Sequence, residues 1–169
     1  MQTKACYGQP IIPPRPPVSP YTAGALPDSG ARQKVVYIED NPSNLRMVVR
    51  ILQATGLYEV LSAPDGESGL ELVARERPAL VLVDLDVPEV NGFEVTRKIK
   101  TSSDPRIACI PVAAISANVL ADERAASLAA GAVAFIEKPF DIQAFRRQIA
   151  ELIRDTAGGR DRDVEDLPR

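Results

Sequence analysis

Short, continuous apolar runs that alternate with amphipathic patterns constrain the fold of this chain more than any other feature. Each run has five to seven residues and is rich in valine, isoleucine and leucine. A run of this kind is typical of a strand buried on both faces, whereas apolar residues spaced three and four apart indicate a helix. The five predicted strands cover residues 35–39, 58–62, 79–85, 110–116 and 132–137.

A helical pattern follows each of the five runs. The first opens at Asn41-Pro42, a capping side chain followed by a proline that the first helical turn tolerates, and Gly56 ends it. Five strands alternating with five helices predict an α/β fold, with a parallel sheet covered on both faces. The apolar positions and segments that mark the helices are Leu45, Val48, Val49 and Leu52; Leu70, Val73 and Ala74, before Pro78; 92–100; the Ala-rich 120–130; and Ile142, Phe145, Ile149 and Leu152, after Asp141.

The domain organisation follows from length and proline content. A chain of 169 residues is long enough for one ordinary domain with tails. Seven of the 15 prolines lie in residues 1–33, which we interpret as a disordered tail or linker, or else as a docking segment for a proline-recognition domain. We expect the domain at 34–155 and a charged, flexible tail at 156–169.

Composition excludes several classes of function. The chain has no histidine, which rules out Ser-His-Asp or Cys-His catalysis and imidazole metal sites. A net charge of -3 without a basic stripe gives no support to nucleic-acid binding. We expect no membrane insertion, because no apolar run could span a bilayer. Cys6 and Cys109 form no paired motif, which favours a cytoplasmic location.

Polar side chains gather at the predicted strand ends. Glu39-Asp40 ends the first strand, Asp84 the third, Ser116 the fourth and Lys138-Pro139 the fifth. In open parallel sheets, ligands bind beyond the carboxyl ends of the strands. We therefore expect these residues to share one rim of the sheet.

The chemistry of this set points to phosphoryl transfer with a divalent cation. Carboxylates without histidine or thiolate suit Mg²⁺ or Mn²⁺, and carboxylates held close together repel one another unless a cation lies among them. A bound cation would orient phosphoryl oxygens for attack by a carboxylate. A lysine and a serine could hold the remaining oxygens.

At this point the sequence resembles the receiver domain of two-component response regulators, from Val35 to Ile153. The stretch EDNPSN at 39–44 is especially similar to receivers of hybrid sensor kinases and to free-standing single-domain receivers. The resemblance implies a flavodoxin-like, doubly wound sheet with strand order 2-1-3-4-5. The matching positions are Glu39-Asp40, the acidic pair that helps to bind metal; Asp84, the phosphoacceptor; Pro88 and Gly92 in the loop that follows; Ser116, the hydroxyl switch; Phe135, the aromatic switch; and Lys138-Pro139, with a cis bond before the proline.

The resemblance also implies partners and a mechanism. Asp84 would accept a phosphoryl group from a phosphohistidine on a histidine kinase or a histidine phosphotransfer protein. The fourth helix, fifth strand and fifth helix would then present an altered face to a downstream protein. Fewer than 20 residues follow the fifth helix, so we expect no output domain, although the chain could be a piece of a larger hybrid kinase.

Asp86 departs from the commonest family pattern. In the family this position ligates metal through its backbone carbonyl and is often neutral. One hypothesis is that the acidic side chain modulates metal affinity or the lifetime of phospho-Asp84, and the other is that Asp86 is a solvated loop residue.

Two other functions remain open from the sequence. Asp84-Leu85-Asp86 has the Asp-x-Asp spacing of haloacid dehalogenase phosphatases, which also form an aspartyl-phosphate. In that family, however, the motif normally ends the first strand, and it would leave Glu39-Asp40 unexplained. The second alternative is an interaction module that is not phosphorylated. On the main interpretation, we expect the chain to be a signalling domain and not an enzyme.

Overall fold

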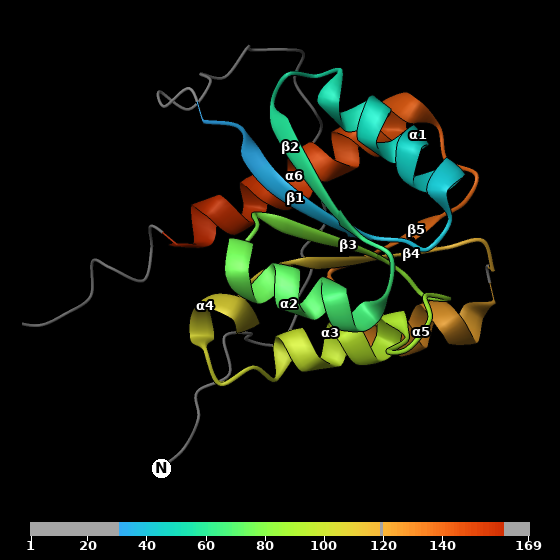
Figure 1. Ribbon diagram of the computed structural model, residues 1–169, viewed down its shortest axis with the longest axis vertical. Helices are drawn as coiled ribbons and strands as arrows, with labels where there is room; N and C mark the ends of the chain where they lie inside the picture. The colour runs from blue at the N-terminus through green and yellow to red at the C-terminus, as the bar shows by residue number, and fades with distance from the viewer. Residues whose placement is uncertain (1–30, 119, 161–169) are drawn as a thin grey trace, which may run out of the picture. The chain divides into compact units, whose positions relative to one another are not determined.

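Five parallel strands form the centre of the domain, in the order β2-β1-β3-β4-β5 (Figure 1). The computed structural model describes residues 31–118 and 120–160, with side chains as far as residue 156. All four neighbouring strand pairs are parallel, which confirms the predicted fold class and strand order. The strands are β1 (Gln33–Ile38), β2 (Tyr58–Ala63), β3 (Leu80–Asp84), β4 (Val112–Ser116) and β5 (Ala134–Glu137).

Within the residues that the structure describes, six helices connect or follow the strands, one more than the sequence predicted. The additional helix is a single turn, α4, which Asp104 caps and Pro105 opens. The predicted fourth and fifth helices are therefore α5 and α6. The helices are α1 (Pro42–Gln53), α2 (Gly66–Glu76), α3 (Gly92–Lys100), α4 (Pro105–Ala108), α5 (Ala121–Ala129) and α6 (Ile142–Arg160).

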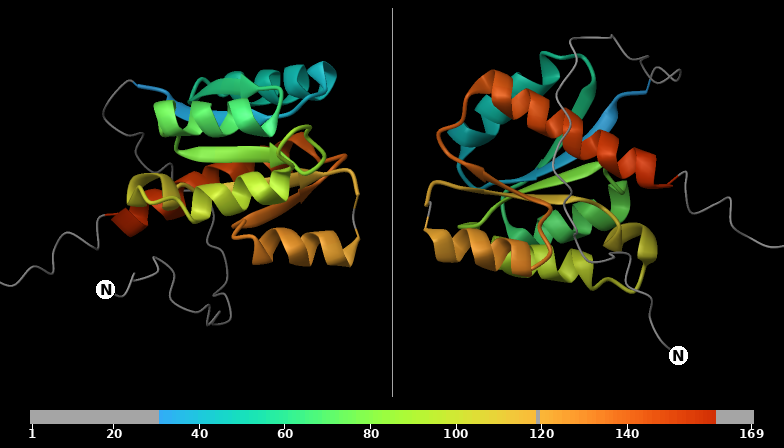
Figure 2. Two further views of the ribbon diagram at one scale, coloured as in Figure 1. Left: turned by 60° about the horizontal axis from the view of Figure 1, so that its bottom comes forward. Right: turned by 180° about the vertical axis from the view of Figure 1, so that it is seen from behind.

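The helices cover both faces of the sheet. Figure 1 shows α2 and α3 in front of the sheet, and the view from behind in Figure 2 shows α6 across the opposite face. On the α6 side, Val48 and Leu52 of α1 and Phe145 and Ile149 of α6 pack on alternate strand residues such as Leu82. A second cluster lies beneath α2 and α3, and a small third one joins Phe135 to the β3–α3 region. Burial of both faces explains why the strands are continuous apolar runs.

Asparagine caps fix the turns that follow β1 and β3. The Asn41 side chain accepts hydrogen bonds from the backbone N–H groups of Ser43 and Asn44, at 2.9 and 3.3 Å. The Asn91 side chain accepts from the N–H of Glu94 at 3.0 Å. Each cap satisfies backbone donors at a helix start. The chain is thereby directed out of the two strands that carry acids at their ends.

Several element boundaries differ from the predictions. The strand β1 begins at Gln33, one residue inside the segment that we assigned to the Pro-rich tail. The last helix continues to Arg160, past the expected domain end at 155. Ile142 is 48% exposed, so the apolar stripe of α6 begins at Phe145 and includes Ile153. The rest of the predicted tails, residues 1–30 and 161–169, lies outside the described residues.

Within the described ranges, no helix is both long and apolar enough to cross a membrane.

Candidate functional site

Three of the predicted site residues meet at the carboxyl ends of β1 and β3. The Lys138 ammonium, in the loop after β5, donates hydrogen bonds to the carboxylates of Glu39, at 2.8 Å, and Asp84. The three side chains are largely shielded from solvent, with exposed fractions of 13% for Lys138, 10% for Asp84 and 1% for Glu39. In a sheet with the order β2-β1-β3-β4-β5, the topological switch point at which ligands bind lies between β1 and β3. The predicted gathering of these three residues is therefore present in the structure.

Glu39 accepts four hydrogen bonds from the protein. One carboxylate oxygen, Oε2, accepts from the Tyr37 hydroxyl at 2.5 Å and from Lys138. The other, Oε1, accepts from the Asn41 N–H at 3.1 Å and from the Asn44 side-chain amide at 3.3 Å. Burial opposes ionisation of Glu39, but Lys138 and Tyr37 together hold its pKa below the ordinary value. Glu39 is therefore an ionised side chain held in one orientation.

Asp84 is held through both of its carboxylate oxygens. Oδ2 accepts from Lys138, and Oδ1 accepts from the Asp86 backbone N–H at 3.0 Å. Burial raises the pKa of Asp84 above the ordinary value, and the nearby Lys138 opposes this rise without cancelling it. The carboxylate thus lies at the end of the fully buried strand β3, oriented by an ammonium group and a backbone amide.

Lys138 remains charged in this position. Burial lowers its pKa, but hydrogen bonds to Asp84 and Glu39 outweigh burial and raise the pKa above the ordinary value. The peptide bond between Lys138 and Pro139 is cis, as the family resemblance implied.

The described part of the chain contains no group of three or more histidine, cysteine, aspartate or glutamate side chains placed to hold a metal ion. The sequence had suggested a cluster of Glu39, Asp40 and Asp84. Instead, the lysine cation lies between Glu39 and Asp84, while Asp40 and Asp86 are exposed. The oxygen atoms at this edge of the sheet nevertheless suit Mg²⁺, because all of them are hard ligands. They belong to the carboxylates of Asp40 and Asp84 and to the Asp86 carbonyl.

The two predicted switch residues both contact the start of α5. Ser116, fully buried at the end of β4, has its hydroxyl 3.2 Å from the Asn118 carbonyl and 3.3 Å from the Glu123 carboxylate. Phe135 is also buried, and the Arg124 guanidinium carbon lies over its ring, 6.0 Å from the ring centre.

Sequence reasoning missed four of these contact residues. Tyr37 and Glu39 are two residues apart along an extended segment and so face the same side, a signal that could have identified Tyr37. Asn118 is only two residues from Ser116, so the short separation could have identified it. Nothing local links Glu123 or Arg124 to the switch residues, because the chain must turn into α5 before they meet.

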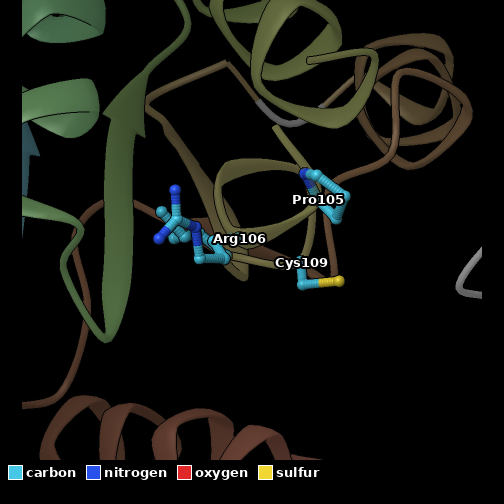
Figure 3. A pocket seen from close by; sticks show the side chains of 4 residues that line it. Pro105, Arg106 and Cys109 are labelled. Carbon is cyan, nitrogen blue, oxygen red and sulfur yellow. The ribbon is translucent and has the colours of Figure 1, made fainter. Parts of the chain in front are cut away.

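A surface pocket of about 280 Å³ lies away from this rim. Figure 3 shows Pro105, Arg106 and Cys109 of its lining, to which Ile110 also contributes. These residues precede β4, so the pocket is at the amino end of that strand, whereas Ser116 is at the carboxyl end. The pocket contains none of the predicted site residues.

Comparison with known proteins identifies the family. The family model described as "Response regulator receiver domain" matches residues 35–150. The polar-differentiation response regulator DivK of Brucella anthropi is 32% identical over 123 residues, covering 73% of this chain and 98% of DivK. The haloacid dehalogenase interpretation of Asp84-Leu85-Asp86 thereby loses its support.

Solved structures give the same result. The receiver domain of a sensor histidine kinase from Pseudomonas aeruginosa, which has a magnesium ion coordinated in its active-site cleft, superposes with a TM-score of 0.67 at 29% identity, covering 73% of this chain and 98% of that one. The chemotaxis response regulator CheY4 of Vibrio cholerae, at 24% identity and a TM-score of 0.66, covers 72% of this chain and 99% of its own and shares the fold. Sequence, topology and family match together show that this chain belongs to the response regulator receiver domains of two-component signalling.

Proposed function

We propose that this receiver accepts a phosphoryl group on Asp84 from a phosphohistidine of a partner protein. The observation that carries the proposal is the contact of Lys138 with both Asp84 and Glu39 at the switch point of the sheet. The partner would be a histidine kinase or a histidine phosphotransfer protein, because this chain contains no histidine of its own. We also propose that this phosphorelay protein acts in the cytoplasm, a location that the cysteine content of the sequence favours.

The transfer step exchanges one bond to phosphorus for another. An Asp84 carboxylate oxygen attacks phosphorus as the phosphorus–nitrogen bond to the partner's imidazole breaks, and the imidazole leaves with the electron pair. Lys138 stays beside Asp84 and pairs with a phosphoryl oxygen. The Asp86 N–H orients the other carboxylate oxygen.

The residues present would hold Mg²⁺ through the carboxylates of Asp40 and Asp84 and the carbonyl of Asp86. When bound, the cation neutralises phosphoryl oxygens and aligns them for in-line attack. Glu39, with both oxygens occupied by protein donors, would support the site by positioning Lys138.

Phosphorylation would switch a protein-interaction surface. The phosphoryl group, with about 1.5 to 2 negative charges and three acceptor oxygens, would replace the single negative charge of the Asp84 carboxylate at the end of β3. The Ser116 hydroxyl would bond a phosphoryl oxygen and Phe135 would repack, shifting the population between two arrangements of α5, β5 and α6. A downstream protein would read this face.

The first test is phosphorylation by a small-molecule donor. Wild-type protein incubated with acetyl phosphate and Mg²⁺ should gain the mass of one phosphoryl group, whereas Asp84→Asn should gain none. Asp122→Asn, which makes the same change on the exposed surface of α5, should be labelled like the wild type. Equal labelling of Asp84→Asn, or labelling that persists in excess chelator, would contradict the proposal.

A further inference from the structure

The first turn of α5 contacts both switch residues of this receiver. Glu123 approaches the hydroxyl of Ser116, and the next residue, Arg124, lies over the ring of Phe135. Ser116 and Phe135 come from different strands, β4 and β5. A displacement of this one turn would therefore change the surroundings of both.

The Ser116 hydroxyl belongs to a closed network of three residues. It accepts a hydrogen bond from the Asn118 N–H at 3.0 Å, and its own hydrogen faces the Asn118 carbonyl and the Glu123 carboxylate. The Asn118 side-chain amide donates to the other Glu123 oxygen at 2.8 Å. The network thus fixes the Glu123 carboxylate next to the hydroxyl.

A serine hydroxyl has only one hydrogen to donate. Ser116 is fully buried, so the hydrogen-bond partners it loses are not readily replaced by bulk water. If the hydroxyl donates to a phosphoryl oxygen on Asp84, it can no longer donate to Glu123. The two anions compete for the same hydrogen.

We propose that Glu123 is a positioning residue that holds the Ser116 hydroxyl in the unphosphorylated state and competes with the phosphoryl group for it. This inference rests on the proposed function, because it assumes that Asp84 is phosphorylated. Release of Glu123 frees the first turn of α5 to move, and Arg124 transmits this movement to Phe135. The α5 surface is thereby coupled to the chemistry at Asp84.

The test is the affinity for beryllofluoride, a noncovalent phosphoryl mimic, measured by calorimetry in the presence of Mg²⁺. Glu123→Ala removes the competing acceptor, and binding should tighten by about five- to tenfold, the value of one net hydrogen bond. Glu123→Gln keeps a neutral acceptor and should tighten binding less. Asp122→Ala removes the same charge from the same helical turn, at an exposed position, and should leave the affinity unchanged.

A double-mutant cycle separates positioning from general charge effects. In a Ser116→Ala background the hydroxyl is absent, so adding Glu123→Ala should change the affinity no further. Equal tightening in both backgrounds, or tightening by Asp122→Ala as large as that by Glu123→Ala, would overturn the inference.

The controls also distinguish this inference from the proposed function. Wild-type protein that binds beryllofluoride normally, together with an unchanged Glu123→Ala variant, would overturn the role of Glu123 alone. Wild-type protein with no Asp84-dependent binding would overturn the proposed function and this inference with it.

Discussion

Asp84 is a carboxylate that the fold makes easier to protonate. From the sequence we expected repulsion between carboxylates held close together at the strand ends. In the structure, burial has the largest effect on the pKa of Asp84 and raises it. The negative charge of Glu39 also raises this pKa, but its effect is the smallest. Because the folded state binds this proton more tightly than the unfolded state does, ionised Asp84 lowers stability at neutral pH. The cost disappears as pH falls through the raised pKa and below the ordinary value of 3.8.

We expect Asp84→Asn to be more stable than the wild type at pH 7 without Mg²⁺, by on the order of 1 kcal/mol. The gain should shrink as pH falls and vanish below pH 3.8, where Asp84 is protonated in both states. Chemical denaturation at several pH values would measure it. Asp122→Asn should show no such gain, and an Asp84→Asn protein less stable than the wild type at pH 7 would show that Lys138 outweighs burial.

At the scale of elements, the close approach of α3 to the end of β3 holds Asp84 in place. Gly92 opens α3, and a Cβ atom at this position would lie 2.5 Å from the Asp84 carbonyl oxygen and 2.8 Å from the Leu85 Cα. Both are backbone atoms, which cannot rotate away as a side chain can. Only glycine lets the helix begin this close to Asp84.

Gly92→Ala should therefore push α3 away from β3, with a loss of about 2 kcal/mol in the free energy of unfolding. Because the crowded atoms include the backbone carbonyl of Asp84, labelling by acetyl phosphate should slow as well. Gly56→Ala is the matched control: its φ of 71° disfavours alanine, but no atom lies within 4 Å of the added Cβ. It should cost roughly 1 kcal/mol and leave labelling unchanged. Equal labelling rates in the two variants would show that Gly92 does not position Asp84.

At the scale of the whole molecule, Lys138 links parts of the chain that are far apart in sequence. Its two partners, Asp84 and Glu39, lie 54 and 99 residues away. The two carboxylates share this one ammonium. Loss of Asp84 leaves Lys138 paired with Glu39, whereas loss of Lys138 leaves two buried anions without their cation.

Lys138→Met should thus destabilise the Mg²⁺-free protein by about 3 kcal/mol, the opposite sign to Asp84→Asn. Adding Mg²⁺ should restore more stability to this variant than to the wild type, because the metal ion would then supply the positive charge that the missing ammonium no longer provides. Thermal unfolding with and without chelator would measure both effects. Lys34→Met removes the more exposed pair with Glu76, at 2.8 Å, and should change stability little. Similar melting temperatures for the two lysine variants would argue against a structural role for the Lys138 pairs.

The sequence by itself determined the strands, most helices and the order of polar residues along the rim. Runs such as 79–85 are local signals. Parallel strands bring their carboxyl ends to one edge of the sheet, whatever the conformation of the connecting loops. Asp84, Glu39 and Lys138 were predictable together for this reason. The single turn α4 was missed because four residues are too short for a helical period.

Only the tertiary structure decided which of these side chains touch. It placed Lys138 between Glu39 and Asp84, where a cluster of carboxylates around a metal had been expected, and it brought Glu123 to Ser116. Such contacts depend on side-chain directions and on distances between elements, which apolar periodicity does not encode. The strand that a residue ends determines its position on the rim. The packing of the surrounding helices and loops determines which side chain it contacts.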